Sequence, residues 1–347
     1  MVENILENIF KIEIPLPNNP LQALNSYIIK GKDRTLVIDT GMNREECKTA
    51  MLDGLAEIGV SLKKIDFFIT HMHTDHCGLV ASLVKSFPMI YCSRPAATGI
   101  AALCRPEYWD KAKAIGHLIG FPEQELQYAI DNHPGNKYCP RGKMSFNILK
   151  DQDTLSVGGY NFTCIETPGH TKGHLCLYEP KAKLLFSGDH ILADITPNIS
   201  LGLTYENDLL LAYINNLDKI SLLDTSLVLP GHRSLITNCK ARIRELKKHH
   251  KLRSDEVLSI LKNGSQNAYQ VASQMTWDMT FETWEQFPVL QKWFACGEAM
   301  AHLKYLEEKQ LIYKDEKEKA YYYSLSERSK DIASCCWAVT LTQAKFF

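Results

Sequence analysis

Three histidines and an aspartate stand within six residues, HMHTDH at positions 71–76, directly after the short apolar segment IDFFIT. That segment has the length and composition of a buried strand, and loops at the carboxyl ends of such strands carry the sites of α/β proteins. A turn there can direct the first two histidines to one point and the aspartate and third histidine to a neighbouring point. Because Zn²⁺ accepts imidazole nitrogen and carboxylate oxygen ligands, the motif predicts a metal site at a sheet edge.

Three further candidate ligands follow later strand-like segments in the same way. TPGHTKGH contains His170, SGDH contains Asp189 and LPGH contains His232, each in a turn introduced by glycine. With the first motif they make five histidines and two aspartates, which is enough for two metals of the catalytic kind with a position left for water. The predicted ligands are His71, His73, Asp75, His76, His170, Asp189 and His232.

The rest of the chain alternates strand-like and helix-like segments, a pattern that predicts the α/β class. Helical stretches separated by prolines interrupt this pattern at 95–143 and are interpreted as an insertion. A long basic helix is predicted from an N-cap at Asn238 to Gly264. Short helices, a longer helix and a hairpin follow, which is the outline of a winged-helix-like module. We therefore expect a catalytic domain at 1–250 and a C-terminal module and tail at 251–347.

Composition excludes several classes of function. Lys and Arg total 39 and Asp and Glu total 40, so the net charge of −1 indicates neither nucleic acid nor an anionic membrane as partner. No apolar run reaches the length of a membrane span, and the N-terminal segment lacks the basic start of a signal peptide. The 11 cysteines include no C-x-x-C pair, so we expect no thiolate zinc knuckle. Since no signal peptide is expected, we predict a cytoplasmic location in which the thiols stay free.

Taken in order, HMHTDHCG, TPGHTKGH, SGDH and LPGH resemble the signature of the metallo-β-lactamase superfamily over about residues 8–250. The glyoxalase II-like and β-lactamase-like hydrolase branches are the most similar. The resemblance implies a four-layer αββα sandwich with a helical insertion and a small winged-helix-like C-terminal domain. It also implies a dinuclear centre in which the first metal is bound by His71, His73 and His170, the second by Asp75, His76 and His232, and Asp189 bridges both.

Two divalent ions about 3.5–4 Å apart can hold a bridging hydroxide near neutral pH, and this hydroxide would be the nucleophile. We expect zinc, with iron or manganese as alternatives. Asp75 is the predicted catalytic residue, because it can orient the hydroxide and shuttle its proton. Cys77 is interpreted as a small buried thiol.

Other polar and aromatic residues are weaker candidates. Asp39 is expected to hold a ligand imidazole, although it can equally cap a turn, and His174 resembles a structural position of the family that lies behind the ligands. His190, Tyr108 and Trp109 are candidates for the substrate pocket, with ordinary helix packing as the alternative.

Departures from relatives narrow the activity. Class B β-lactamases do not use an aspartate at the position of Asp189, and related lactonases carry a tyrosine where this chain has Leu192. The apolar residues of the insertion at 95–143 suit an acyl chain, so we expect a hydrolase of a small acyl substrate, such as a thioester, ester or lactone. An endoribonuclease or nucleic-acid-binding hydrolase and a mononuclear iron persulfide dioxygenase stay open as alternatives. The tail is only slightly basic, so nucleic acid and membrane are not expected as partners, while a homodimer stays open.

Overall fold

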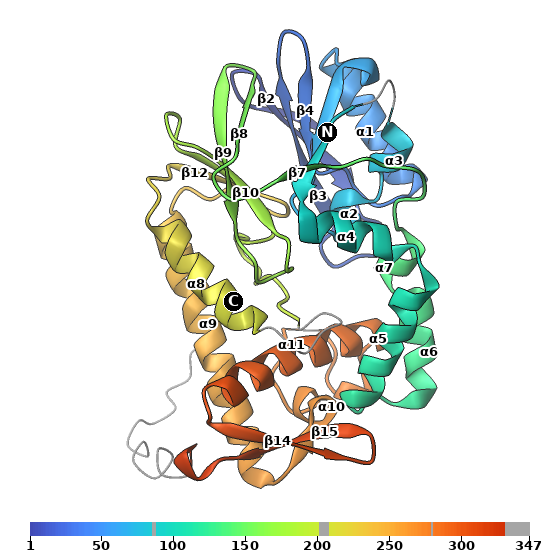
Figure 1. The fold of residues 1–347 in the computed structure, drawn as a ribbon, viewed down its shortest axis with the longest axis vertical. Helices are drawn as coiled ribbons and strands as arrows, with labels where there is room; N and C mark the ends of the chain where they lie inside the picture. Colours follow the sequence, from blue (N-terminus) through green and yellow to red (C-terminus); the bar gives the residue numbers. More distant parts are fainter. Residues whose placement is uncertain (85–87, 201–207, 279, 330–347) are drawn as a thin grey trace.

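The computed structural model, which describes all residues except 85–87, 201–207, 279 and 330–347, has two large β-sheets in the upper half of the view in Figure 1. The first sheet has seven strands in sequence order, antiparallel from β1 to β4 and parallel from β4 to β7. Its strands are β1 (Val2–Leu6), β2 (Ile9–Pro15), β3 (Ala23–Lys30), β4 (Thr35–Ile38), β5 (Ile65–Phe68), β6 (Ile90–Ser93) and β7 (Asn147–Leu149).

The second sheet has five strands in the order β12-β11-β10-β9-β8, with one parallel pair, β11 and β12. Its strands are β8 (Thr154–Val157), β9 (Tyr160–Glu166), β10 (Leu175–Glu179), β11 (Leu184–Gly188) and β12 (Leu227–Pro230). The inner faces of the two sheets share one buried apolar cluster, to which the first contributes Tyr27 and Phe68 and the second Phe162 and Phe186. The ring centroids of Tyr27 and Phe186 are 5.2 Å apart, so the two sheets pack face to face.

Helices cover the outer face of each sheet. The first sheet is covered by α1 (Glu45–Glu57), α2 (Thr74–Cys77), α3 (Val80–Leu83) and α4 (Arg94–Leu103), and the second by α8 (Leu209–Ser221) and α9 (Cys239–Ile260). Gly54 of α1 lies directly on Ile12, where a Cβ would come within 2.7 Å of the isoleucine side chain. The order helix, sheet, sheet, helix confirms the predicted four-layer α/β sandwich.

The predicted insertion is helical and begins with α4. Its other helices are α5 (Pro106–Leu118), α6 (Glu123–Asn132) and α7 (Pro134–Lys137). The three prolines that separate the predicted stretches stand at the starts of these helices: Pro106 and Pro134 are first residues, and Pro122 is the N-cap of α6. Proline is tolerated there because the first N–H groups of a helix have no intrahelical acceptor.

Helices and a small sheet make up the described residues after α9, which we call the C-terminal part. These are α10 (Ala268–Ala272), α11 (Val289–Glu308), β13 (Gln266–Asn267), β14 (Ile312–Lys317) and β15 (Ala320–Leu325). Short 3₁₀ turns lie at Leu62–Lys64, Leu261–Asn263 and Trp284–Gln286. The core of this part is shared with the insertion, since Leu126 of α6 and Leu303 of α11 belong to one buried cluster. Helices followed by a hairpin agree with the predicted outline, and the winged-helix comparison stays a prediction.

The long basic helix α9 joins the two parts. Its N-cap is Asn238, as predicted, whose side chain accepts a hydrogen bond from the N–H of Ala241. Leu246 in its first half packs in the core of the second sheet, whereas Val257 in its second half packs in the core shared with the insertion. The predicted domain boundary at residue 250 therefore falls inside one continuous helix, and the division itself stays a prediction.

The expectation of free thiols is wrong for one pair of cysteines. Cys104 at the end of α4 and Cys139 after α7 form a disulfide across a sequence separation of 35 residues. Seven other cysteines of the described chain are free and buried, while Cys335 and Cys336 lie outside the described residues. The pairing depends on how the insertion folds back on α4, which spacing alone does not reveal.

Among the described helices, none is long and apolar enough to cross a membrane, and the cytoplasmic location stays a prediction.

Replacing the exposed Cys104 by serine should lower the free energy of unfolding by about 3–4 kcal/mol, the range for a crosslink that closes a loop of this length. Urea unfolding of the oxidised protein and of Cys104→Ser measures the difference. Wild-type protein in excess reductant is the control, and it should unfold at the same urea concentration as the variant. Equal stability of all three samples would contradict the crosslink.

Candidate metal centre

The HMHTDH motif follows the end of β5, at the edge where the parallel strands end, and its last three residues, Thr74 to His76, belong to the short helix α2. The three other motifs follow β9, β11 and β12, and they reach the same edge because the two sheets are stacked. The structure thus brings together all seven predicted ligands, which are separated by up to 161 residues in the chain (71 to 232).

One group of candidate ligand atoms comes from three histidines. Single ring nitrogens of His71, His73 and His170 lie within 4.8 Å of one another. His73 Nδ1 and His170 Nε2 are only 2.9 Å apart. Three imidazole nitrogens converging on one point match the donor set of a catalytic zinc site.

A second group is formed by Asp75, His76 and His232, whose candidate atoms also lie within 4.8 Å of one another. Asp75 Oδ2 is 3.3 Å from His232 Nε2 and 3.8 Å from His76 Nε2. Asp189 lies between the two groups: its Oδ1 is 3.4 Å from His76 Nε2, and its Oδ2 is 3.6 Å from the Nε2 atoms of both His170 and His232. One carboxylate thus faces ligands of both groups.

Four of the atoms that face this centre lack a hydrogen-bond partner among the described residues. These atoms are His71 Nε2, His76 Nε2, His232 Nε2 and Asp189 Oδ1, and all four are buried. An unsatisfied buried polar atom costs about 1–3 kcal/mol, so four at one place need a common explanation. Divalent cations coordinated by these lone pairs provide it, and the residues present therefore fit a metal centre.

Hydrogen bonds at the opposite ring nitrogens fix how four of these imidazoles point. Each Nδ1 lies 2.7–2.9 Å from an oxygen atom, which leaves the Nε2 lone pair free for a metal. The pairs are His71 with Thr70 Oγ1, His76 with Asp39 Oδ2, His170 with the carbonyl of Asn198 and His232 with the carbonyl of Ala23.

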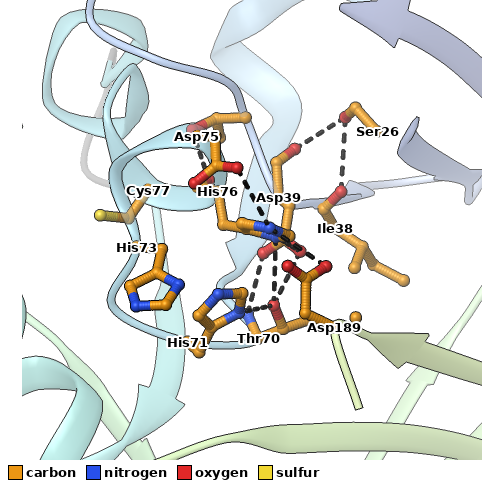
Figure 2. A network of polar contacts seen from close by, with 12 residues as sticks. Ser26, Ile38, Asp39, Thr70, His71, His73, Asp75, His76, Cys77 and Asp189 are labelled. Atoms are coloured by element: carbon orange, nitrogen blue, oxygen red, sulfur yellow. Dashed lines mark hydrogen bonds and ion pairs between the residues drawn. The ribbon is translucent and has the colours of Figure 1, made fainter. Parts of the chain in front are cut away.

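Asp39 takes part in the hydrogen bonds that orient two of these imidazoles, those of His76 and His71 (Figure 2). Its carboxylate accepts hydrogen bonds from His76 Nδ1 at 2.7 Å, from the Thr70 hydroxyl at 2.8 Å and from the Thr70 N–H at 2.9 Å. Because the Thr70 hydroxyl donates to Asp39, it can accept from His71 Nδ1, 2.9 Å away. Asp39 therefore orients one imidazole directly and another through Thr70.

His174 is not a member of either ligand group. Its Nε2 accepts a hydrogen bond from the N–H of Asp189 at 3.1 Å, and its Nδ1 faces the Thr167 hydroxyl at 2.8 Å. Both ring nitrogens are thus engaged, and the imidazole holds the backbone of Asp189. Gly188 has a φ of 48°, and a Cβ there would lie 2.7 Å from His174 Nε2, so glycine is required directly before the ligand.

The three candidates for the substrate pocket lie in different surroundings. His190 is fully buried beside Tyr213, with ring centroids 5.2 Å apart, and it does not belong to the ligand groups. Trp109 is 8% exposed in the core that the insertion shares with the C-terminal part, and its Nε1 donates to the carbonyl of Leu103. Tyr108 packs partly buried against the same core. Trp109 thus has the surroundings of a packing residue.

Charge and burial set the protonation of the centre. Burial alone would raise the pKa of Asp75, but His76 and His232 outweigh it and hold that pKa below its usual value. The Asp75 carboxylate is therefore ionised at neutral pH. Burial and the neighbouring His76 and His73 lower the pKa of His71, which keeps this imidazole neutral as a ligand must be. Burial also raises the pKa of Cys77, so its thiol stays protonated and unreactive.

Solvent reaches the centre from one side. His73 is exposed and the Asp75 side chain is 13% exposed, whereas His71, His76 and His232 are fully buried. A substrate would therefore approach across His73 and Asp75.

Several residues that contact the site were not foreseen, among them Thr70, Asn198 and Ala23. Thr70 directly precedes the motif, and its position at a strand end was the available signal. Asn198 contributes a main-chain carbonyl to His170 from 28 residues further along the chain, and nothing in the residue type marks it.

Comparisons with known proteins agree with this geometry. A family model described as the metallo-beta-lactamase superfamily matches residues 20–232. The probable metallo-hydrolase YqjP of Bacillus subtilis is 26% identical over 322 residues, which cover 88% of this chain and 94% of that protein. An atrochrysone carboxyl ACP thioesterase of Aspergillus fumigatus is 24% identical over 70% of this chain and 61% of that protein.

A solved structure extends the likeness beyond the matched family region. A metallo-beta-lactamase family protein from Thermus thermophilus superposes with a TM-score of 0.80 at 24% identity. The alignment covers 93% of this chain and all of that one, so the fold of the insertion and the C-terminal part is shared as well.

Proposed function

Because this chain belongs to the metallo-beta-lactamase superfamily, we propose that it is a dinuclear metal-dependent hydrolase that cleaves a small acyl substrate, in the first place a thioester. The observation that carries the proposal is the set of buried, unpartnered ring nitrogens and carboxylate oxygen that converge between the two sheets. The superfamily and the cluster of histidines and aspartates support a metal-dependent hydrolase. The number of metals and the acyl substrate are the proposed part.

Zinc is the metal we propose for both positions. The donors are imidazole nitrogens and carboxylate oxygens, which suit Zn²⁺. His71, His73 and His170 would hold one ion, Asp75, His76 and His232 the other, and Asp189 would contact both. When bound, the metals supply Lewis acidity that polarises the scissile carbonyl and lowers the pKa of water towards neutral.

Asp75 is the residue proposed to handle the proton. Its carboxylate is ionised, partly exposed and beside His232, so it can accept a hydrogen bond from the attacking water and hold the proton that is lost. Asp39 and His174 keep their neighbours in place through hydrogen bonds to His76 and to the backbone of Asp189. No serine or cysteine nucleophile is needed, and the Cys77 thiol donates to the carbonyl of Met72 instead.

A thioester is favoured among acyl substrates for two reasons. One relative is named as a thioesterase that acts on an acyl carrier protein substrate, although it covers only part of both chains. The partly buried Met72, between two ligand histidines in the sequence, packs against Gly99 of α4 in the insertion and would offer apolar surface to an acyl chain. Nucleic acid is not proposed as a substrate, and a homodimer stays a prediction.

A panel of matched substrates tests this function. Zinc-loaded protein should cleave an acyl thioester with a kcat/KM at least about tenfold above the matched oxygen ester, because a thiolate is the better leaving group, and excess chelator should abolish both reactions. Thiol release measures the first reaction, and a lactone and an RNA oligonucleotide complete the panel. RNA cleavage that falls steeply with salt, without acyl hydrolysis, would contradict the proposal. One iron per chain with oxygen consumption would instead indicate a dioxygenase.

A further inference from the structure

The segment 189–200, which follows β11, takes part in the metal centre at two points. Asp189 at its start faces both ligand groups. Nine residues later, the carbonyl of Asn198 accepts a hydrogen bond from His170 Nδ1 at 2.8 Å. The path of this segment therefore decides where one ligand lies and how a second one points.

Helix α11 of the C-terminal part lies against the end of this segment (Figure 1). The side-chain amide of Asn198 donates to the carbonyl of Phe294 in α11 at 3.3 Å. One helical turn further on, Gly297 faces Ser200, and a Cβ at Gly297 would come within 3.1 Å of the serine Cβ. The helix backbone thus approaches the segment closely because residue 297 has no side chain.

Helix α9 holds the middle of the same segment. Arg242 donates from Nε to the carbonyl of Leu192 at 2.7 Å and from Nη2 to the carbonyl of Ile195 at 2.8 Å. These charge-assisted bonds fix the segment between Asp189 and Asn198. Asn198 follows between the buried Pro197 and Ile199, and its peptide carbonyl must keep its direction towards His170.

We propose that Asn198 is a positioning residue that couples α11 to the metal centre, so that the C-terminal part maintains the ligand orientation of His170. A peptide carbonyl can turn away from an imidazole at little cost unless its residue is held elsewhere. The side chain of Asn198 provides that hold, because its amide is bonded to the backbone of a buried helix. Partners of this kind orient a ligand imidazole and raise its basicity.

This inference rests on the proposed metal centre but not on the substrate class, since metal binding is measured without turnover. Asn198→Ala removes the amide and keeps the carbonyl. Asn198→Asp keeps the size and loses the donor. The matched control is Asn136→Ala, which removes a similar bond from an asparagine side chain to the carbonyl of Ile130 within the insertion.

Zn²⁺ affinity is measured by competition with a chromophoric chelator, and Co²⁺-substituted protein reports ligand geometry through its visible absorption bands. Both Asn198 variants should bind one of the two metals about tenfold more weakly and show altered Co²⁺ bands. Asn136→Ala should match the wild type in both measurements. Thermal unfolding of the metal-free proteins separates loss of ligand orientation from loss of fold.

Gly297→Ala tests the same contact from the side of α11. The added methyl pushes the helix from Ser200, while alanine favours a helix more than glycine does. Zinc affinity should therefore fall although the fold is not weakened. Wild-type affinity and Co²⁺ bands in Asn198→Ala, Asn198→Asp and Gly297→Ala would overturn the coupling. A wild-type protein that binds no metal would instead overturn the proposed function on which the coupling rests.

Discussion

Asp75→Ala should lower acyl hydrolysis by about 10³–10⁴-fold while the protein keeps close to one metal ion per chain. Asp75 belongs to the second ligand group, where its Oδ2 lies 3.3 Å from His232 Nε2. Its loss removes both a ligand and the proposed proton acceptor. His71, His73 and His170 do not depend on this carboxylate and should still hold the first ion. Elemental analysis and the initial rate of thioester cleavage measure the two effects.

Asp110→Ala, an exposed aspartate on α5, is the control and should retain two metals and full activity. Wild-type rates in Asp75→Ala would mean that a single metal carries the reaction without this carboxylate. A variant with no metal and no activity would instead mean that the two groups bind metal cooperatively, with no independent first site.

Asp189→Asn should have a larger effect, with activity lowered by at least about 10⁴-fold and less than one metal per chain after dialysis. The two oxygens of Asp189 face His76 on one side and His170 and His232 on the other. An amide of the same size offers only one oxygen, so it cannot serve both groups. It also removes the negative charge that would offset the two proposed cations at a buried position.

The matched control is Asp194→Asn, which makes the same change at an exposed position five residues further along the chain. It should bind two metals and react at the wild-type rate. Retention of two metals by Asp189→Asn would contradict a shared carboxylate and leave the two groups as separate sites.

Two glycines next to Asp189 in space or in sequence, Gly231 and Gly188, also determine where this ligand can lie. A Cβ at Gly231 would lie 2.6 Å from Asp189 Oδ1 and 2.8 Å from His76 Cε1, so the glycine of the LPGH motif leaves room for both ligands. The glycine of SGDH is needed for a different reason, since its φ of 48° is the left-handed region. These glycines are therefore part of the metal centre, although neither has a side chain.

The place of Trp109 and the pairing of Cys104 with Cys139 both depend on tertiary contacts that the sequence does not reveal. Periodicity predicts that residues 95–143 are helical, but it does not reveal which face of each helix turns to the metal centre. The face that carries Trp109 turns to the core shared with α11. The Cys104–Cys139 disulfide was likewise missed, because it depends on how the insertion folds back after α7.

The features that could be predicted from the sequence alone are local. Strands, turns and ligand types follow from alternation, glycine positions and side-chain chemistry within a few residues, and the ligands could be listed from four short motifs. The groups that orient the ligand imidazoles depend on contacts between segments far apart in the chain. His232 donates to the carbonyl of Ala23, 209 residues away, and His170 donates to a carbonyl that α11 helps to hold. Every residue type carries such a carbonyl, so only the packing of the two sheets and the C-terminal helices selects which one faces an imidazole.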